Sequence, residues 1–99
     1  MTAHILAEAE LDLETAFQYY ESARLGLGVE MLNEFRRGVG QILLNPGAWQ
    51  ALDAEYRRYR LHRFPYGIIY RTAKKETEIL IVAIIHLSRK PDVWHGRQE

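Results

Sequence analysis

The stretch that decides the fold is RRYRLHRFPYGIIYRTAKKETEILIVAII, residues 57–85. Two of its segments alternate apolar with polar residues, which is the period of a β-strand. The apolar positions are Tyr59 and Leu61 in the first segment and Tyr66, Ile68 and Tyr70 in the second. Pro65 separates the two segments, because proline cannot donate a hydrogen bond to a sheet. We therefore predict one strand on each side of Phe64-Pro65.

The third strand of this stretch is the apolar run Ile79–Ile85. It follows the polar residues 74–76, which predict a hairpin turn. Because the run is apolar on both faces, we expect it to lie centrally and to be covered on both sides. A shorter strand would fall near Ala3–Leu6. The expected sheet is therefore three- to four-stranded and antiparallel.

The chain before residue 46 has the period of two amphipathic helices. The apolar positions are Ala9, Leu13, Ala16, Phe17 and Tyr20 in the first, and Leu32, Phe35, Val39, Ile42 and Leu43 in the second. Gly26 and Gly28 should end the first helix near Arg24, and Asn45-Pro46-Gly47 should end the second. The second helix also contains Gly38 and Gly40, which we explain by a close approach to a neighbouring element.

Helices followed by strands predict an α+β fold. An antiparallel helical hairpin over about residues 8–45 would pack on one face of a sheet over about residues 57–87, followed by a tail, 88–99. A chain of 99 residues makes one domain, and 47% hydrophobic with 26% charged residues is typical of a folded one.

Several classes of site and location are disfavoured by the composition. The chain has no cysteine, which excludes disulfides and thiolate chemistry. The spacing of His4, His62 and His95 does not match a metal site, so we expect no metal and no cofactor. The longest apolar run has seven residues, against the ~20 that span a bilayer. The N-terminus also lacks the features of a secretory signal, so we expect a cytoplasmic protein.

The formal net charge of zero conceals two oppositely charged halves. Residues 1–55 have three basic and nine acidic residues, a net charge of −6, whereas residues 56–99 have ten basic and four acidic residues, a net charge of +6. Such asymmetry predicts a surface that meets an anionic partner. The alternative is that the two halves neutralise each other within the fold.

Short motifs from Ala7 to Arg97 resemble the RelE/ParE superfamily, small bacterial toxins of type II toxin–antitoxin modules that are often labelled plasmid-stabilisation proteins. The motifs are Ala9-Glu10-Leu11, Tyr19-Tyr20-Glu21, Gly26-Leu27-Gly28, Asn45-Pro46, Arg63-Phe64-Pro65-Tyr66, Ile69-Tyr70-Arg71 and His86-x-x-Arg89-x-Pro91-x-x-Trp94-x-x-Arg97. The resemblance implies two N-terminal helices against an antiparallel sheet. It also implies a cognate antitoxin, whose disordered C-terminal segment folds as it binds.

The superfamily has two branches with different activities. RelE-like members are ribosome-dependent nucleases that cleave mRNA, whereas ParE-like members poison DNA gyrase. Basic positions of the nucleases are filled here by Arg58 and Arg60, but Gly67 stands where they have a key strand arginine and Trp94 where they have a C-terminal tyrosine. We therefore expect a ParE-like toxin that acts by binding. The alternatives are a RelE-like nuclease or an inactive orphan member.

The nuclease alternative depends on five residues. They are Arg58, Arg60, Arg71, His86 and Arg89. His86 is its acid–base candidate, because an imidazole titrates near neutral pH. We expect His86 to continue the face of Leu80, Val82 and Ile84, where a structural, hydrogen-bonded histidine competes with the catalytic interpretation.

Two candidate binding surfaces follow from the basic half. The predicted antitoxin-binding residues are Arg57, Arg58, Tyr59, Arg60, His62 and Tyr66, for which a nucleic-acid surface or a solvated strand face are the alternatives. The predicted target-binding tail contains Arg89, Lys90, Trp94 and Arg97, with Trp94 either exposed or folded back on the core. We expect Tyr19, Tyr20, Phe35 and Val39 to be core residues, although an apolar groove along the hairpin could hold an antitoxin helix.

Overall fold

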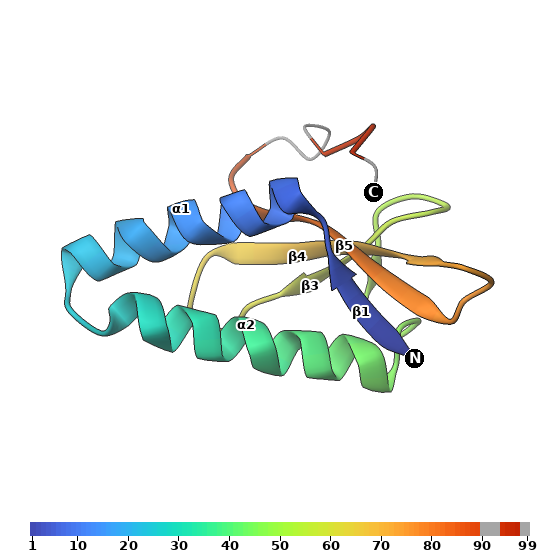
Figure 1. Cartoon of the computed structure of the whole chain (residues 1–99), viewed down its shortest axis with the longest axis horizontal. Helices are drawn as coiled ribbons and strands as arrows, with labels where there is room; N and C mark the ends of the chain where they lie inside the picture. Colours follow the sequence, from blue (N-terminus) through green and yellow to red (C-terminus); the bar gives the residue numbers. More distant parts are fainter. Residues whose placement is uncertain (90–93, 98–99) are drawn as a thin grey trace.

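The computed structural model describes residues 1–89 and 94–97 of the chain. Its elements are, in chain order, β1 (Thr2–Ile5), α1 (Ala7–Ala23), α2 (Leu27–Leu44), β2 (Gln50–Ala51), β3 (Arg57–Arg60), β4 (Tyr66–Ala73) and β5 (Glu78–His86). The two helices form an antiparallel hairpin that lies along a single five-stranded sheet (Figure 1). The predicted α+β class is confirmed.

The sheet differs in detail from the one expected. Its strand order is β1-β5-β4-β3-β2, and β1 runs parallel to β5, so the sheet is mixed and not antiparallel throughout. The prediction of three to four strands was wrong, because β2 has two residues and leaves no periodic pattern in the sequence. Strand β5 lies between β1 and β4 and is buried along Ile79–Ile85, as its apolar run predicts.

A bulge in β5 reverses the direction of the side chains that follow it. Ile69 pairs with Ala83 and Tyr70 pairs with Ile81, so Val82 has no partner on β4. Val82 and Ala83 consequently pack on the same face of the sheet, whereas Ile84 packs on the helix side. The expectation that His86 shares a face with Val82 was therefore wrong.

Two hydrophobic cores lie on opposite faces of the sheet. The main core, between the hairpin and the sheet, includes Met31, Phe35, Tyr59, Ile68 and Ile81. The second core, on the outer face, consists of Leu6, Tyr56, Ile69, Leu80, Val82, Ala83, Ile85 and Trp94. Both faces of the central strands are thus removed from water, which stabilises the sheet through apolar burial.

The hairpin is held by contacts at its turn and along α2. The Glu21 carboxylate accepts hydrogen bonds of 2.9 Å from the backbone N–H groups of Gly26 and Gly28, which caps the start of α2. Gly38 approaches the sheet so closely that a Cβ there would lie 2.8 Å from Tyr59 Cε1. Gly40 has open space around it, so the close-approach explanation is correct for Gly38 and wrong for Gly40.

Neither α1 nor α2 meets the requirements for crossing a membrane. Within residues 1–89 and 94–97, none combines the necessary length with the necessary apolar character.

Candidate functional site

Strand β3 places its side chains on two different surfaces. Tyr59 is buried against Ile68 and α2 in the main core, and the following Leu61 is buried with it. Arg58 and Arg60 alternate with these residues and point to the outer face, where they pair in register with Ile69 and Gly67. The strand therefore has the apolar face and the cationic face that the sequence predicts.

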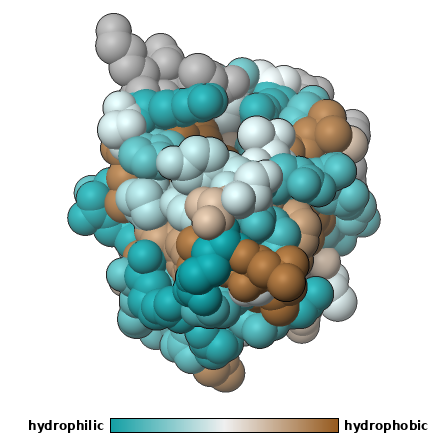
Figure 2. All heavy atoms as spheres, turned by 90° about the vertical axis from the view of Figure 1, so that its left-hand side faces the viewer, coloured by the Kyte–Doolittle hydropathy of each residue, from teal (hydrophilic) through white to brown (hydrophobic). Residues whose placement is uncertain are grey.

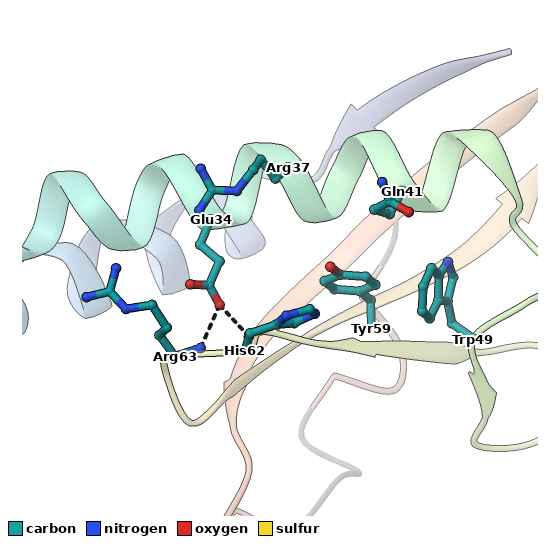
Figure 3. Close-up of a pocket in the computed structure, with 7 residues that line it drawn as sticks. All are labelled: Glu34, Arg37, Gln41, Trp49, Tyr59, His62 and Arg63. Carbon is teal, nitrogen blue, oxygen red and sulfur yellow. Dashed lines mark hydrogen bonds between the residues drawn. The ribbon is translucent and has the colours of Figure 1, made fainter.

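An open groove of about 450 Å³ lies between α2 and the end of β3. Its lining residues are Glu34, Arg37, Gln41, Trp49, Tyr59, His62 and Arg63, and we name it the β3 groove (Figure 3). The rings of Trp49 and Tyr59 meet edge to face, with centroids 4.7 Å apart. His62 stacks on Tyr59 at 6.3 Å. An aromatic floor with cationic residues around it suits an apolar anchor flanked by carboxylates.

Glu34 fixes the side of the β3 groove that the β3–β4 turn forms. Its Oε1 accepts hydrogen bonds from the backbone N–H groups of His62 and Arg63, although the side chain is buried in the hairpin–sheet interface (Figure 3). One turn earlier on α2, Glu30 accepts a 2.7 Å bond from the Arg63 guanidinium. That bond holds the pKa of Glu30 below its ordinary value. Two acids of α2 thus position the turn that carries His62.

The predicted antitoxin-binding residues do not share one surface. Arg57 donates to the Trp49 carbonyl oxygen at 2.7 Å, and Tyr66 packs edge to face on His86 near α1. Of the predicted set, Tyr59 and His62 reach the β3 groove. Arg58 and Arg60 lie on the other side of the sheet. The structure therefore divides these six residues between the groove, the outer face, the start of β4 and, for Arg57, the recess beside Pro46 and Tyr70.

On the outer face, the stem of Arg58 covers Gly67. A Cβ at residue 67 would lie 2.8 Å from Arg58 Cδ and 2.9 Å from its Cγ. The guanidinium donates to Gln50 Oε1 at 2.9 Å. Burial, and then the charge of Arg60, lower the pKa of Arg58 from its ordinary value. An arginine at position 67 would therefore have to displace Arg58.

His86 lies at the end of β5 with its ring on the helix side. Its imidazole meets Tyr66 edge to face at 5.2 Å, and its Nδ1 accepts a 3.1 Å hydrogen bond from the Ser88 backbone N–H. The Ser88 hydroxyl is also 2.8 Å from the same nitrogen. These contacts hold the His86 ring in place at the end of β5.

The described part of the tail folds back onto the sheet. Trp94 is 1% exposed and packs on Tyr56 with centroids 4.4 Å apart, and the His95 ring lies 4.0 Å from Trp94 and 5.6 Å from Tyr56. Arg97 bonds Asp12 at 2.7 Å and the Val82 carbonyl oxygen at 2.9 Å. Of the predicted target-binding residues, Arg89 is exposed and Lys90 lies outside the described residues. A contact between Trp94 and a target would require the tail to leave the second core.

The turn of the hairpin exposes apolar side chains. Leu25 is 88% exposed and Tyr19 is 68% exposed, so the expectation that Tyr19 belongs to the core was wrong, whereas Phe35 is buried as expected. Figure 2 shows this end of the molecule, where a small hydrophobic area lies among mostly hydrophilic residues.

Comparison with known proteins identifies the family. The model described as "ParE toxin of type II toxin-antitoxin system, parDE" matches residues 4–91. The chain belongs to the ParE toxin family. Its structure is similar to a chain of the solved "Chromosomal ParDE TA system from P. aeruginosa", with a TM-score of 0.76 at 21% identity, over 89% of this chain and 97% of that chain. At this identity the likeness shows the fold. No curated protein matches the chain significantly.

The predicted place of the chain in the RelE/ParE superfamily, on the ParE-like side, is thus confirmed. Within this ParE-family fold, Arg58, His86 and Arg89 of the nuclease alternative border one small recess, whereas Arg60 and Arg71 do not line it. Arg71 on the outer face lies 3.9 Å from Glu55, while the His86 ring is on the helix side. The recess that Arg58, Arg89 and Trp94 border has a volume of about 10 Å³, the space of one water molecule.

Several residues of the candidate site and its surroundings were missed by sequence reasoning. They are Glu34, Arg37, Gln41 and Trp49 of the β3 groove and Asp12, which binds Arg97. Glu34 carried a signal, because it lies beside Phe35 in the stripe that also contains Met31 and Ile42, and an acid there needs hydrogen-bond donors. The other four are polar or loop residues without a periodic pattern.

Proposed function

We propose that this chain is a ParE-type toxin that inhibits growth by binding DNA gyrase in the cytoplasm, and that a cognate antitoxin neutralises it. The observation that carries the proposal is the family match over residues 4–91. The packing of Arg58 on Gly67 supports action by binding, because the Arg58 side chain leaves no room for a phosphate-binding arginine at position 67.

The β3 groove is the antitoxin site in this proposal. Its aromatic floor of Trp49 and Tyr59 offers a place for an apolar side chain. Arg37 and Arg63 line it as cations, while the Glu34 carboxylate is already engaged by two backbone N–H groups. An acidic segment that folds on binding fits this combination of charge and apolar surface.

Target binding is tested with purified full-length chain and purified gyrase. The proposal expects the chain to inhibit supercoiling or to accumulate cleaved DNA, and addition of the antitoxin to restore activity. Unaffected gyrase at a large molar excess of the chain contradicts the gyrase part. An absence of growth inhibition in cells as well would identify an inactive family member.

The antitoxin site is tested by a matched pair of neighbouring charge reversals on α2. Arg37→Glu places an acid in the β3 groove and should weaken antitoxin binding by about tenfold or more, whereas Arg36→Glu is exposed outside it and should have little effect. Titration calorimetry gives both affinities. Equal affinities for the two variants would place the antitoxin elsewhere.

A further inference from the structure

A second open recess lies at the end of the molecule opposite the hairpin turn, where α2 ends and the N-terminus lies (Figure 1). Its volume is about 450 Å³, within the range of about 300–1,000 Å³ that is usual for small-molecule sites. We name it the Pro46 recess. The lining residues that matter most for its chemistry are Met1, Pro46, Ala54, Glu55, Arg57 and Glu76. None of them lines the β3 groove, so the two recesses can hold different ligands.

Arg57 lies beside Tyr70 on the helix side of the sheet. The two residues oppose each other on β3 and β4, so their side chains share the face on which Tyr70 is buried. The Arg57 guanidinium donates to the Trp49 carbonyl oxygen at 2.7 Å, and the Tyr70 hydroxyl donates to the Pro46 carbonyl oxygen at 2.6 Å. Burial raises the pKa of Tyr70, and the nearby charge of Arg57 opposes this rise. Arg57 and the Pro46 wall of the recess are thus held in place before a ligand binds.

Arg57 is a half-buried cation that has no counter-charge among the residues that the structure describes. Within residues 1–89 and 94–97, the arginines that form ion pairs are Arg24, Arg63, Arg71 and Arg97. The bond to the Trp49 carbonyl oxygen is the one hydrogen bond of the Arg57 side chain in this part of the chain, and it uses one of five N–H donors. The guanidinium fork matches a carboxylate, which accepts two parallel N–H bonds. A carboxylate is therefore the ligand group that we expect on Arg57.

Two acids make the Pro46 recess unsuitable for a ligand of high negative charge. Glu55 and Glu76 are exposed and line the recess together with Arg57. Their carboxylates repel a phosphate and attract an ammonium group. Glu55 stands two residues before Arg57, so the Cα atoms of the two residues are at most about 7 Å apart. A ligand that reaches both therefore carries its negative and its positive charge close together.

Apolar side chains complete the recess, since Met1, Pro46 and Ala54 also line it. We propose that the Pro46 recess binds a free α-amino acid with an aliphatic side chain. Its carboxylate would bind Arg57, its ammonium group would lie beside Glu55 and Glu76, and its side chain would pack on the apolar part of the lining. This inference goes beyond the proposed function, because it assigns a small-molecule site outside the β3 groove and holds whatever protein the toxin inhibits.

Titration of the isotope-labelled full chain with three related ligands, followed by NMR at constant ionic strength, tests the inference. The ligands are L-leucine, isocaproate, which lacks the amino group of leucine, and isoamylamine, which lacks its carboxylate. Leucine should shift the amide signals of Gly47, Ala54 and Thr72, which line the recess, until the site is saturated. Each analogue should bind about tenfold or more weakly than leucine, because it loses a charge-assisted contact. Inorganic phosphate should also bind more weakly than leucine.

Variants of the lining residues assign the two charges of the ligand. Arg57→Gln should weaken leucine binding by about tenfold or more and should not weaken the binding of isoamylamine. Glu55→Gln/Glu76→Gln should weaken leucine binding and should not weaken the binding of isocaproate. Arg60→Gln is the matched control, since it removes the same charge from β3 on the outer face and should leave leucine binding unchanged.

Three results would overturn the inference. The first is equal affinity for leucine and isocaproate, which would indicate a site for carboxylates in general. The second is tighter binding of phosphate than of leucine. The third is the absence of saturable shifts at the recess up to the solubility limit of leucine. All three are measured on the parent chain, so the inference is decided even if Arg57→Gln does not fold.

Discussion

The Asp12 carboxylate and the Arg97 guanidinium, 2.7 Å apart, together complete the edge of β5 where β1 ends. Strand β1 pairs with β5 up to Ile81. Beyond it, Arg97 donates to the Val82 carbonyl oxygen at 2.9 Å and Asp12 accepts from the Ile84 N–H at 3.1 Å. An ion pair between α1 and the tail thus satisfies backbone groups that a longer β1 would otherwise bond.

Arg97→Ala should lower the free energy of unfolding by about 1–3 kcal/mol, because it removes charge-assisted bonds and leaves the Val82 carbonyl oxygen without its donor and Asp12 without its counter-charge. Arg24→Ala is the control, since its pair with Glu30 is exposed and contributes little to stability. Urea unfolding measures both changes. An Arg97→Ala protein as stable as the parent would show that the tail is not fastened to α1.

Trp94→Ala should lower the free energy of unfolding by about 3–5 kcal/mol, the usual cost of truncating a buried aromatic residue. Trp94→Phe keeps part of the packing on Tyr56 and should cost less. In a Trp49→Phe background, Trp94 should show the blue-shifted emission of a buried indole. Emission at the position of free tryptophan, with unchanged stability in Trp94→Ala, would contradict the placement of Trp94 in the second core.

Gly38 and Gly40 of α2 should respond to alanine in opposite directions. Gly38→Ala should destabilise the fold by about 1–3 kcal/mol, because its Cβ would lie 2.8 Å from Tyr59 Cε1 and 3.0 Å from Ile68 Cδ1. Gly40→Ala should stabilise it by about 0.5–1 kcal/mol, since alanine favours the helix and meets open space. Thermal unfolding of the two variants distinguishes them, and changes of the same sign would contradict the close approach of α2 to β3.

The strands and helices could be predicted where a local period reports burial. Tyr59, Leu61 and Ile68 alternate in sequence because they alternate in space, and the hairpin follows from its two apolar stripes. The parallel pairing of β1 with β5 joins segments more than 70 residues apart and leaves no local signal. The bulge at Val82 adds one residue within a wholly apolar run, so the face of His86 could not be read from alternation.

For the site, the sequence located the cationic strand but not the surfaces that it forms. Arg58 and Arg60 of β3 were predicted together, and their assignment to the outer face follows from pairing in the sheet. The β3 groove also needs α2 and the loop at Trp49, which meet β3 through tertiary packing. The tail has no period, so the sequence alone does not decide between an exposed Trp94 and the Trp94 that packs in the second core.

Stability should fall as the pH rises above about 10, with Tyr70 as one cause. Burial raises the pKa of Tyr70 from 10.0 to about 12, against a smaller lowering by Arg57, and the hydroxyl donates to the Pro46 carbonyl oxygen at 2.6 Å. Because the folded pKa exceeds the unfolded value, this stabilisation is complete below pH 10.0 and is lost as the pH rises towards about 12.

Urea unfolding on either side of this window compares the parent with Tyr70→Phe. The variant should lose less stability between the two pH values, and the remaining loss is expected from Tyr20 and Tyr66, whose pKa values burial also raises. Equal losses in the two proteins would exclude Tyr70 as a contributor.

The central claim is that the chain inhibits growth by binding gyrase and not by cleaving RNA. The most direct measurement is to induce the chain in growing bacteria and to follow plasmid supercoiling and gyrase–DNA cleavage complexes beside the integrity of ribosome-bound mRNA. We predict altered supercoiling or accumulated cleavage complexes while the mRNA stays intact. Cuts in ribosome-bound mRNA with unaffected gyrase would contradict the account.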